Sequence, residues 1–502
     1  MARLSSAALV LAVLPALAGA GAEYGREPAA APTRLEARAL EAVRTRLRPA
    51  PRTSPALVLA ARELAARAAS GAREPIARAA VRAALARALA SDPSPAAVLV
   101  EAAPDEVPAA VARALPRPSA THAGVGAVER EGTAFVVVLL SERRARLDPF
   151  PREVAAGAQA TLSGTLLAPF SRPRVFVTRP GGEVVDAGGA AGPAFRVPLE
   201  FPGAGRHVVE VVAEGEGGPE VAALFTVAAG GASLDVPARA AAAPEPADRS
   251  SSEAGVLAAL NATRARHGLA PVTAAPEVAA VARRHAEAMA AAGRVAHVLP
   301  ASPDAGARLR GAGVPYRRTY ENVARAGTAL EAHAAAEDSP AHLANVLRPG
   351  ATRAGVGIAR ARLPSGDPNV YLAEILVEPP DDGAASPLTS DARVREALWR
   401  ERARLGLAPL TADAALDALA REAAEHMRTR DEPETDGLAD RALGLRRRLA
   451  AVDVFVAGGP DDAVRSANVK DARFGRVGVG VVSGDSARFG RARLWIAVVY
   501  TD

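Results

Sequence analysis

Cysteine is absent from this chain of 502 residues, and aromatic residues make up only 3% of it. The absence of cysteine excludes a disulfide framework, thiol-based catalysis and a lipid anchor on an N-terminal cysteine. With so few aromatic rings, the cores must be filled with Ala, Val and Leu. Lysine is almost missing as well, because Lys470 is the only one and arginine supplies nearly all of the positive charge.

The charge of the chain gives little reason to expect a nucleic-acid partner. The formal net charge is only +5. No basic stripe is interleaved with aromatic side chains that could stack on bases. We therefore expect no nucleic acid among the partners.

Long apolar runs are also missing, since none beyond the N-terminus is long enough to cross a bilayer. At the N-terminus, Arg3 precedes an apolar run over residues 7–17, and small residues follow at 18–22. This order is typical of a secretory signal peptide over residues 1–22, with an Ala-rich start to a soluble protein as the alternative. The pattern predicts a secreted protein, periplasmic or extracellular, without a transmembrane segment.

Internal repetition organises most of the remaining sequence. Residues 261–273 and 399–411 follow one pattern, and each precedes a helical apolar pattern that ends at a methionine. Both stretches continue to a Gly-Val-Gly, at 355–357 and 478–480, and both end in a β-rich run. These two stretches are predicted to be copies of one module.

A fainter copy of the same module lies nearer the N-terminus. Residues 40–48 and 55–69 have helical patterns in the same order, and a Gly-Val-Gly at 124–126 precedes a strand pattern. We therefore predict three copies of an α/β module, over residues 33–146, 252–380 and 390–502.

Between the first and middle copies the composition changes. Over residues 149–230, β-branched and polar residues alternate in short runs broken by Gly and Pro, which predicts a small all-β sandwich of immunoglobulin-like size. Ala- and Pro-rich residues at 231–251 and 379–387 are typical of linkers. The expected fold class is α/β multidomain, with three modules and one β-sandwich.

The middle copy carries polar residues that the flanking copies lack. A helical pattern over 276–292 ends before Gly293, a residue type that commonly stops helices. His285 lies inside that helix and is expected to be partly buried there, whereas His297 follows the helix.

Two further segments of the middle copy bring polar residues. Glu321 and Asn322 precede Val-Ala in a strand-like run. Ser339 and Pro340 are expected to begin a helix that carries His342 in its first turn.

This order of motifs resembles the CAP superfamily (cysteine-rich secretory proteins, antigen 5 and pathogenesis-related proteins, also called SCP-like) in its cysteine-free bacterial form. The resemblance covers about residues 252–379. It implies an α-β-α sandwich with a cleft lined by two histidines and acidic residues, often able to hold a divalent cation. Matched position by position, the cleft histidines are His297 and His342, and the first acid is Glu321.

The sequence departs from the family pattern at three places. Tyr320 stands where the family usually has glycine, and Ala336 where it usually has an aromatic residue. The second acid of the family aligns with Ser339, although Glu337 and Asp338 are close by. Three members of the expected group of four are therefore present.

The residue types themselves allow several functions. His297, His342 and Glu321 could hold Zn²⁺, or Mg²⁺ or Ca²⁺, and leave a position for a reactive water. Without metal, the same residues with Asn322 could bind a small molecule or lipid, and a histidine could act as acid or base. We expect binding, with a metal-assisted hydrolase or a structural envelope or adhesion protein as alternatives, so enzymatic activity stays open.

The flanking copies provide an internal comparison. In the third copy the position of His297 falls at Thr435 or Asp436, and that of His342 falls at Arg465. In the first copy His122 aligns with Arg353 at the closing strand. We therefore expect the flanking copies to serve as scaffold or as a surface for an envelope or extracellular protein.

Overall fold

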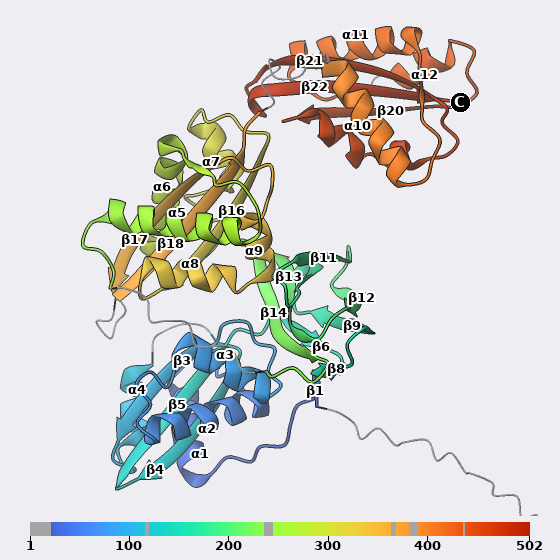
Figure 1. Cartoon of the computed structure of the whole chain (residues 1–502). Helices are drawn as coiled ribbons and strands as arrows, with labels where there is room; N and C mark the ends of the chain where they lie inside the picture. Colours follow the sequence, from blue (N-terminus) through green and yellow to red (C-terminus); the bar gives the residue numbers. More distant parts are fainter. Residues whose placement is uncertain (1–21, 116–119, 235–243, 363–367, 381–389, 435–436) are drawn as a thin grey trace, which may run out of the picture. The chain divides into compact units, whose positions relative to one another are not determined.

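The structure is a computed structural model that describes residues 22–115, 120–234, 244–362, 368–380, 390–434 and 437–502. Nearly all of the predicted signal peptide and part of each predicted linker lie outside these ranges. The chain is mixed α/β with several sheets, as the sequence predicts (Figure 1). Across the described ranges, no helix is long and apolar enough to span a membrane.

The chain forms two compact units. One comprises Met1–Ala213 with Val221–Arg239, and the other comprises Glu214–Glu220 with Ala240–Asp502. The first unit contains an α/β module and a β-sandwich, and the second contains two further α/β modules.

Each α/β module is built on a four-stranded sheet, and the strand order is the same in all three. The orders are β2-β4-β5-β3, β15-β17-β18-β16 and β19-β21-β22-β20. In each sheet a two-residue strand runs parallel to its neighbour, and the other pairs are antiparallel. In the same order, the strands of the first module span Arg52–Thr53, His122–Arg130, Thr133–Ser141 and Ala96–Ala102. Those of the middle module span Thr273–Ala274, Arg353–Arg362, Pro368–Glu378 and Arg318–Ala326. Those of the third module span Thr411–Ala412, Arg476–Ser486, Gly490–Thr501 and Ala450–Ala457.

Helices cover the sheets. The first module has α1 (Arg34–Arg46), α2 (Pro55–Ala69), α3 (Arg78–Arg87) and α4 (Val107–Ala114). The middle module has α5 (Arg249–Arg266), α6 (Pro276–Ala292), α7 (Ala305–Gly311), α8 (Ala329–Glu337) and α9 (Pro340–Val346). The third has α10 (Ser390–Arg404), α11 (Ala414–Arg430) and α12 (Leu438–Leu443), with 3₁₀ turns η1 (Pro460–Arg465) and η2 (Asn468–Lys470).

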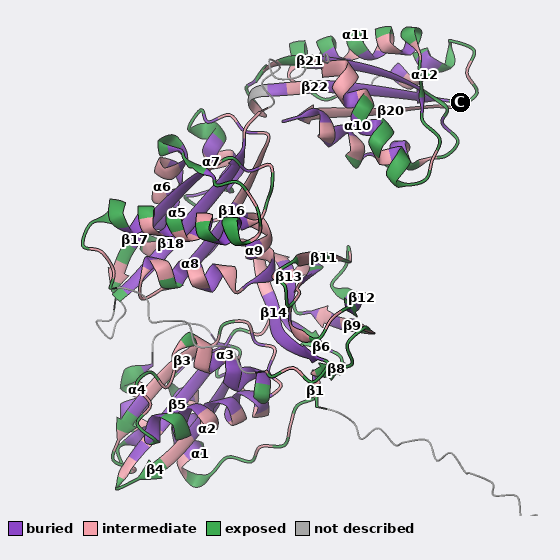
Figure 2. Cartoon of the chain, in the orientation of Figure 1, coloured by how far each residue is buried: buried purple, intermediate pink, exposed green. Residues whose placement is uncertain are grey.

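The middle sheet is a central layer between two layers of helices. Along β18, Tyr371, Ala373 and Ile375 share a core with α6 and α7. The alternate residue Leu372 shares a second core with α5 and α8. Because successive side chains of a strand point to opposite faces, the sheet separates these two cores, and its strands are buried (Figure 2).

Helix α6 has the bounds that the sequence predicts. Pro276 occupies its first turn, where the missing N–H costs nothing, and Gly293 ends it with φ of +64°. Its buried face includes Val278, Val281 and Met289. The structure also confirms the helix predicted to begin at Ser339-Pro340 and the helix predicted over residues 55–69.

The Gly-Val-Gly signature has a packing cause. A Cβ on Gly355 would lie less than 3.0 Å from the backbone of Ala279, and one on Gly357 would meet Arg283 equally closely. Helix α6 therefore packs directly on the backbone of β17. The glycine pairs of the other modules meet α2 and α11 in the same way.

The β-sandwich consists of two sheets, in the orders β11-β10-β13-β14-β8 and β12-β9-β6. Burial alternates strictly along β12, with Phe195, Val197, Leu199 and Phe201 inside. The strands of the five-stranded sheet, in this order, span Val184–Gly189, Ser171–Thr178, Gly205–Gly215, Gly218–Ala229 and Glu153–Val154. Those of the three-stranded sheet span Ala194–Phe201, Ala158–Leu166 and Ala145–Leu147.

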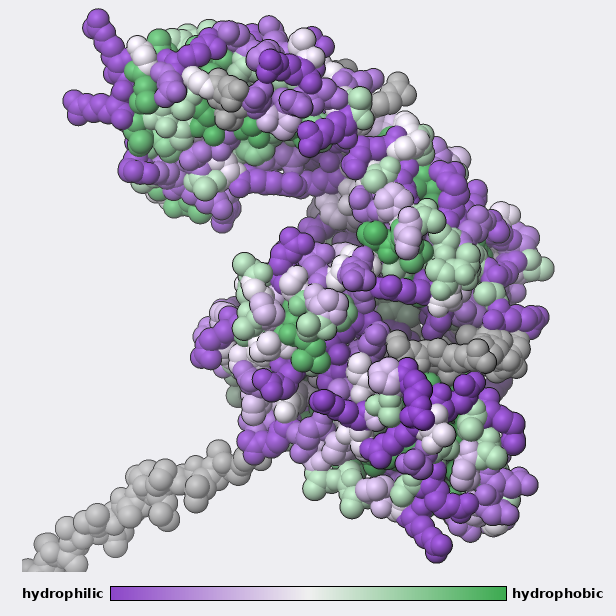
Figure 3. All heavy atoms as spheres, turned by 180° about the vertical axis from the view of Figure 1, so that it is seen from behind, coloured by the Kyte–Doolittle hydropathy of each residue, from purple (hydrophilic) through white to green (hydrophobic). Residues whose placement is uncertain are grey.

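The observed boundaries differ from the predicted ones by a few residues. β6 pairs with β9, so the sandwich sheets begin at Ala145, where the sequence pattern places their start at 149. The strand β1 (Glu23–Tyr24) pairs with β7 (Phe150–Pro151). Hydrophilic residues dominate the face seen in Figure 3, with hydrophobic residues only in small patches.

Candidate functional site

The candidate site lies at the edge of the middle sheet, on strand β16. Among the described strands, β16 pairs only with β18, so its other edge is open to side chains from helices and loops. Successive side chains of the strand point to opposite faces, which places Glu321 on the α7 side and Asn322 on the α8 side. The neighbours confirm this, because Val323 belongs to the core with α7 and Ala324 to the core with α8.

Glu321 is held by two partners. Its Oε2 lies 3.0 Å from Nδ1 of His297, and its Oε1 accepts a hydrogen bond from Nη2 of Arg308 at 2.7 Å. The carboxylate is buried, with 5% of the side chain exposed. Burial raises the pKa of Glu321, but the hydrogen bond and charge of His297 and the charge of Arg308 lower it more, so the net shift is downward.

His297 lies in the loop between α6 and α7. Since Nδ1 contacts the ionised carboxylate of Glu321, this nitrogen carries a proton and Nε2 lies on the far side of the ring. The ring centroid lies 6.2 Å from that of His342, and the two planes are tilted by 38°. The imidazole is partly exposed, in contrast to the buried acid behind it.

His342 approaches from the other face of the sheet. Ser339 caps α9, and its Oγ accepts a hydrogen bond from N of His342 at 3.3 Å. Nδ2 of Asn322 donates to O of His342, and Nδ2 of Asn345 donates to O of Glu321. The structure thus brings all four predicted residues together at the edge of β16.

His285 is fully buried, where the sequence predicts partial burial. Its Nδ1 lies 2.8 Å from Oγ of Ser302, and its Nε2 lies 2.9 Å from O of Ala296. Both ring nitrogens are thereby satisfied, and burial lowers the pKa of the imidazole. The contacts tie α6 to the loop that carries His297.

The predicted metal ligands do not form a metal-binding arrangement. Among the described residues, no three His, Asp or Glu side chains are grouped so that they could hold a metal ion. The reason at this site is chemical, because Oε1 of Glu321 accepts from the cationic Arg308 and Oε2 contacts His297. A metal bound to Glu321 would therefore share a carboxylate whose two oxygens already contact Arg308 and His297.

A second charged group, which no sequence motif indicated, lies behind the site. Nδ1 of His333 lies 2.6 Å from Oε1 of Glu374, and Nε2 lies 3.2 Å from Oε1 of Glu337. Burial lowers the pKa of His333, but the charge of Glu374 and the hydrogen bonds to both acids raise it more, to about 10. Asn322 links this group to the site, because its Nδ2 also donates to Oε2 of Glu374. An acid inside the apolar run of β18 was the available signal.

The described residues of the third module include no counterpart of Glu321 or His342. In each module, one residue of the neighbouring strand pairs both with the first glycine of Gly-Val-Gly and with a residue of the edge strand. That edge-strand residue is Glu321 in the middle module and Val452 in the third. Arg465 lies in η1 and forms an ion pair with Asp462. Thr435 and Asp436 lie outside the described residues.

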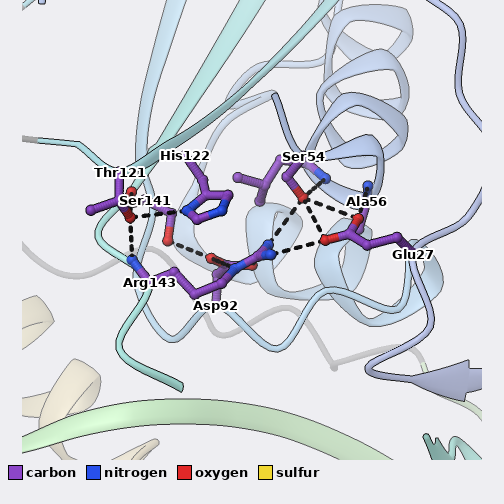
Figure 4. A network of polar contacts seen from close by, with 9 residues as sticks. Glu27, Ser54, Ala56, Asp92, Thr121, His122, Ser141 and Arg143 are labelled. Atoms are coloured by element: carbon purple, nitrogen blue, oxygen red, sulfur yellow. Dashed lines mark hydrogen bonds and ion pairs between the residues drawn. The ribbon is translucent and has the colours of Figure 1, made fainter. Parts of the chain in front are cut away.

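The first module has a polar network of another kind (Figure 4). The guanidinium of Arg143 contacts Glu27, Ser54 and Asp92, and Asp92 also accepts from Oγ of Ser141. His122 lies beside it, and burial followed by the charge of Arg143 lowers its pKa. This network ties the N-terminal segment to the end of the first sheet.

An α-β-α module with two histidines and an acid at the sheet edge is thus defined by fold and site. Residues 257–371 match the model of the cysteine-rich secretory protein family, CAP. This stretch is a CAP domain, and the family expected from the motifs is confirmed for the middle module.

Solved structures show more distant likenesses. An extracellular protein with an SCP domain from Bacillus anthracis str. Ames is 17% identical over 34% of this chain and 64% of its own, with a TM-score of 0.23. This chain therefore covers less than two thirds of that protein. A cysteine-rich secretory protein from Staphylococcus aureus subsp. aureus Mu50 is 12% identical over 48% and 83%, with a TM-score of 0.22.

An outer surface protein from Borrelia burgdorferi is 14% identical over 25% of this chain and 91% of its own, with a TM-score of 0.22. TM-scores this low carry no argument about fold or function, so the family assignment rests on the family model. The comparison with curated proteins gives no significant match.

Proposed function

We propose that the middle module binds a small molecule, with lipids among the candidates, through His297, Glu321, His342 and Asn322. The observation that carries the proposal is the chain of contacts from Arg308 through Glu321 to Nδ1 of His297. A buried carboxylate that holds one ring nitrogen fixes the direction of the other. Nε2 of His297 is therefore the group that meets a ligand.

The chemistry of the site favours a ligand with an oxygen acceptor. Nη1 of Arg308 is buried and has no hydrogen-bond partner among the described residues. A buried donor without an acceptor is costly, so an oxygen atom of a ligand or of a water would stabilise it. A fatty-acid carboxylate or a sterol hydroxyl would supply such an atom, but only the hydroxyl could also donate to an unprotonated Nε2 of His297.

The proposal is tested by titrating the full chain with palmitate and with a fluorescent sterol. We expect saturable binding of at least one probe, which His297→Ala and His342→Ala each weaken at least about tenfold. His426→Ala is the matched control, because His426 is an exposed histidine of α11. Binding that both site variants retain, or the failure of both probes to bind, would count against the proposal.

We further propose that the flanking modules are copies of the CAP module that serve as scaffold or interaction surface. Beyond the shared strand order, each module has an acid on its first helix that pairs with an arginine on its second and accepts from the N–H that follows Gly-Val-Gly. These sets are Glu36, Arg62 and Ala127; Glu253, Arg283 and Ile358; and Asp391, Arg421 and Val481. Composition alone does not produce such matched contacts.

The immunoglobulin-like character of the β-sandwich and the secretion of the chain belong to the same proposal. Tyr24 is buried in the first unit, and its hydroxyl donates to O of Thr226 at 2.6 Å. A mature chain must therefore retain Tyr24. N-terminal sequencing of the exported protein should find a start within residues 19–23, and an intact Met1 would contradict the proposal.

The metal-assisted hydrolase and the structural envelope protein stay predictions. A metal bound by His297, His342 and Glu321 would share a carboxylate whose two oxygens already contact Arg308 and His297. Activity on a peptide or peptidoglycan panel that disappears with Glu321→Gln would support the hydrolase.

A further inference from the structure

Arg308 is the charged residue of the site that no sequence motif indicated. Its Nη2 donates to Oε1 of Glu321 at 2.7 Å, and only 8% of its side chain is exposed. The two groups form a buried ion pair directly behind the imidazole of His297. The guanidinium is therefore the positive charge closest to the acid that the metal hypothesis requires.

Arg308 is fixed in this position by the local fold. Asp304 caps α7, and the helix carries Arg308 at the end of its first turn. Nε of Arg308 donates to O of Pro303 at 2.6 Å, and Nη2 also donates to O of His297 at 3.3 Å. Three anchors on one planar group leave the guanidinium little freedom to swing away from Glu321.

A divalent metal and this guanidinium compete for the same carboxylate. A metal would have to approach an oxygen of Glu321 to about 2.0–2.2 Å, although each oxygen already has a partner, Arg308 at Oε1 and His297 at Oε2. The metal ion and the guanidinium of Arg308 are both positive and would both contact Glu321. They would therefore repel each other strongly in this buried site. The carboxylate also holds Nδ1 of His297, so a metal that takes Oε2 would release the ring.

We propose that Arg308 is the resident cation of this site and that it excludes divalent metals from Glu321. Its guanidinium pairs with Glu321, and Glu321 in turn contacts Nδ1 of His297 and orients the ring. The middle module is then a metal-independent member of its family. This proposal concerns the same site as the proposed function, but the two are tested separately. Metal titration tests the role of Arg308, and titration with palmitate or a sterol tests small-molecule binding, so either proposal can be refuted without the other.

The test is a calorimetric titration of the full chain with Zn²⁺, in wild type and in Arg308→Gln and Arg308→Lys variants. We expect no Zn²⁺ binding that depends on His297 in the wild type or in the Lys variant, which keeps the charge. Arg308→Gln should bind Zn²⁺ at least about tenfold more tightly than wild type, and His297→Ala in that background should abolish the gain.

Two results would overturn the inference. One is stoichiometric Zn²⁺ binding by the wild type that His297→Ala removes. The other is a folded Arg308→Gln variant whose Zn²⁺ affinity equals that of the wild type. If Arg308→Gln does not fold, histidine NMR of the wild type decides, since stoichiometric Zn²⁺ must leave the His297 signals unshifted.

Discussion

Oε2 of Glu321 and Nδ1 of His297 lie 3.0 Å apart, although the two residues come from different elements, an edge strand and the loop after α6. The contact depends on the direct packing of α6 on the sheet, because α6 sets where the loop begins. It also depends on His285, which ties that loop to the helix. The site is thus a consequence of how closely the helix approaches the strand.

The first prediction concerns that close approach. Gly355→Ala would place a Cβ less than 3.0 Å from the backbone of Ala279, so α6 must move. We expect the free energy of unfolding of the middle module to fall by about 1–3 kcal/mol or more. This free energy is measured by urea unfolding of the full chain, observed through signals from residues of the middle module.

Gly255→Ala is the matched control for this substitution. Gly255 lies inside α5, and no heavy atom lies within 4 Å of the position of its Cβ. Replacing glycine by alanine in a helix should stabilise the module by up to about 1 kcal/mol. Equal effects of the two substitutions would refute the packing argument.

A second prediction concerns a buried arginine that donates to backbone carbonyls. Arg264 donates to the backbone carbonyls of Ala270, Val346, Arg348 and Ala351. Arg264→Met leaves several buried acceptors without donors, at about 1–3 kcal/mol for each, so we expect a loss of at least about 3 kcal/mol. The melting temperature of the middle module should fall accordingly.

The control for Arg264 is Arg284→Met on the exposed face of α6. We expect a change within about 0.5 kcal/mol, as is usual for surface positions. Arg402 makes the same kind of contacts in the third module, to Ala408, Val469, Asp471 and Phe474. A fall for Arg264→Met no larger than for Arg284→Met would show that these contacts do not stabilise the fold.

A third prediction concerns pH. The folded state raises the pKa of His333 from 6.5 to about 10, so the protonated ring favours folding. This stabilisation is fully present below about pH 6.5 and is lost as the pH rises through about 10. The loss should amount to roughly 3–5 kcal/mol. Unfolding of the middle module between about pH 6 and about pH 10.5 measures it.

The comparison with His333→Gln isolates this contribution from other groups that titrate in alkali. The variant should be less stable at neutral pH, because buried Glu374 loses its cationic partner and keeps the hydrogen bond from Asn322. It should also lose the part of the pH dependence that belongs to His333. An unchanged slope in the variant would show that His333 is not protonated at neutral pH.

Much of the fold follows from local patterns. The apolar spacing, Pro276 and Gly293 predict α6 with its observed bounds, because helix termini depend on neighbours in the sequence. The Gly-Val-Gly signature indicates the repeated strand, although only the structure shows the helix backbone against it. The family motifs identify the four site residues in the sequence, and the fold then brings these residues together.

The partners of those residues could not be found in this way. Arg308 and Arg310 are both arginines of one short helix in an arginine-rich chain, and only the turn of α7 decides which one meets Glu321. Arg310 contacts the hydroxyl of Tyr316 instead. The contact of His333 with Glu374 joins a helix to a strand far along the chain, and no local pattern specifies it.

The most direct test of the account is the tautomer of His297 in the full chain, measured by nitrogen NMR of labelled histidine. Nδ1 should carry a proton, held by Glu321, and whenever the ring is in its neutral form Nε2 should be the unprotonated nitrogen. Glu321→Gln should remove this preference, and His426→Ala should not change it. A neutral His297 protonated at Nε2 in the wild type would contradict the account, because the ring would then not be oriented by Glu321.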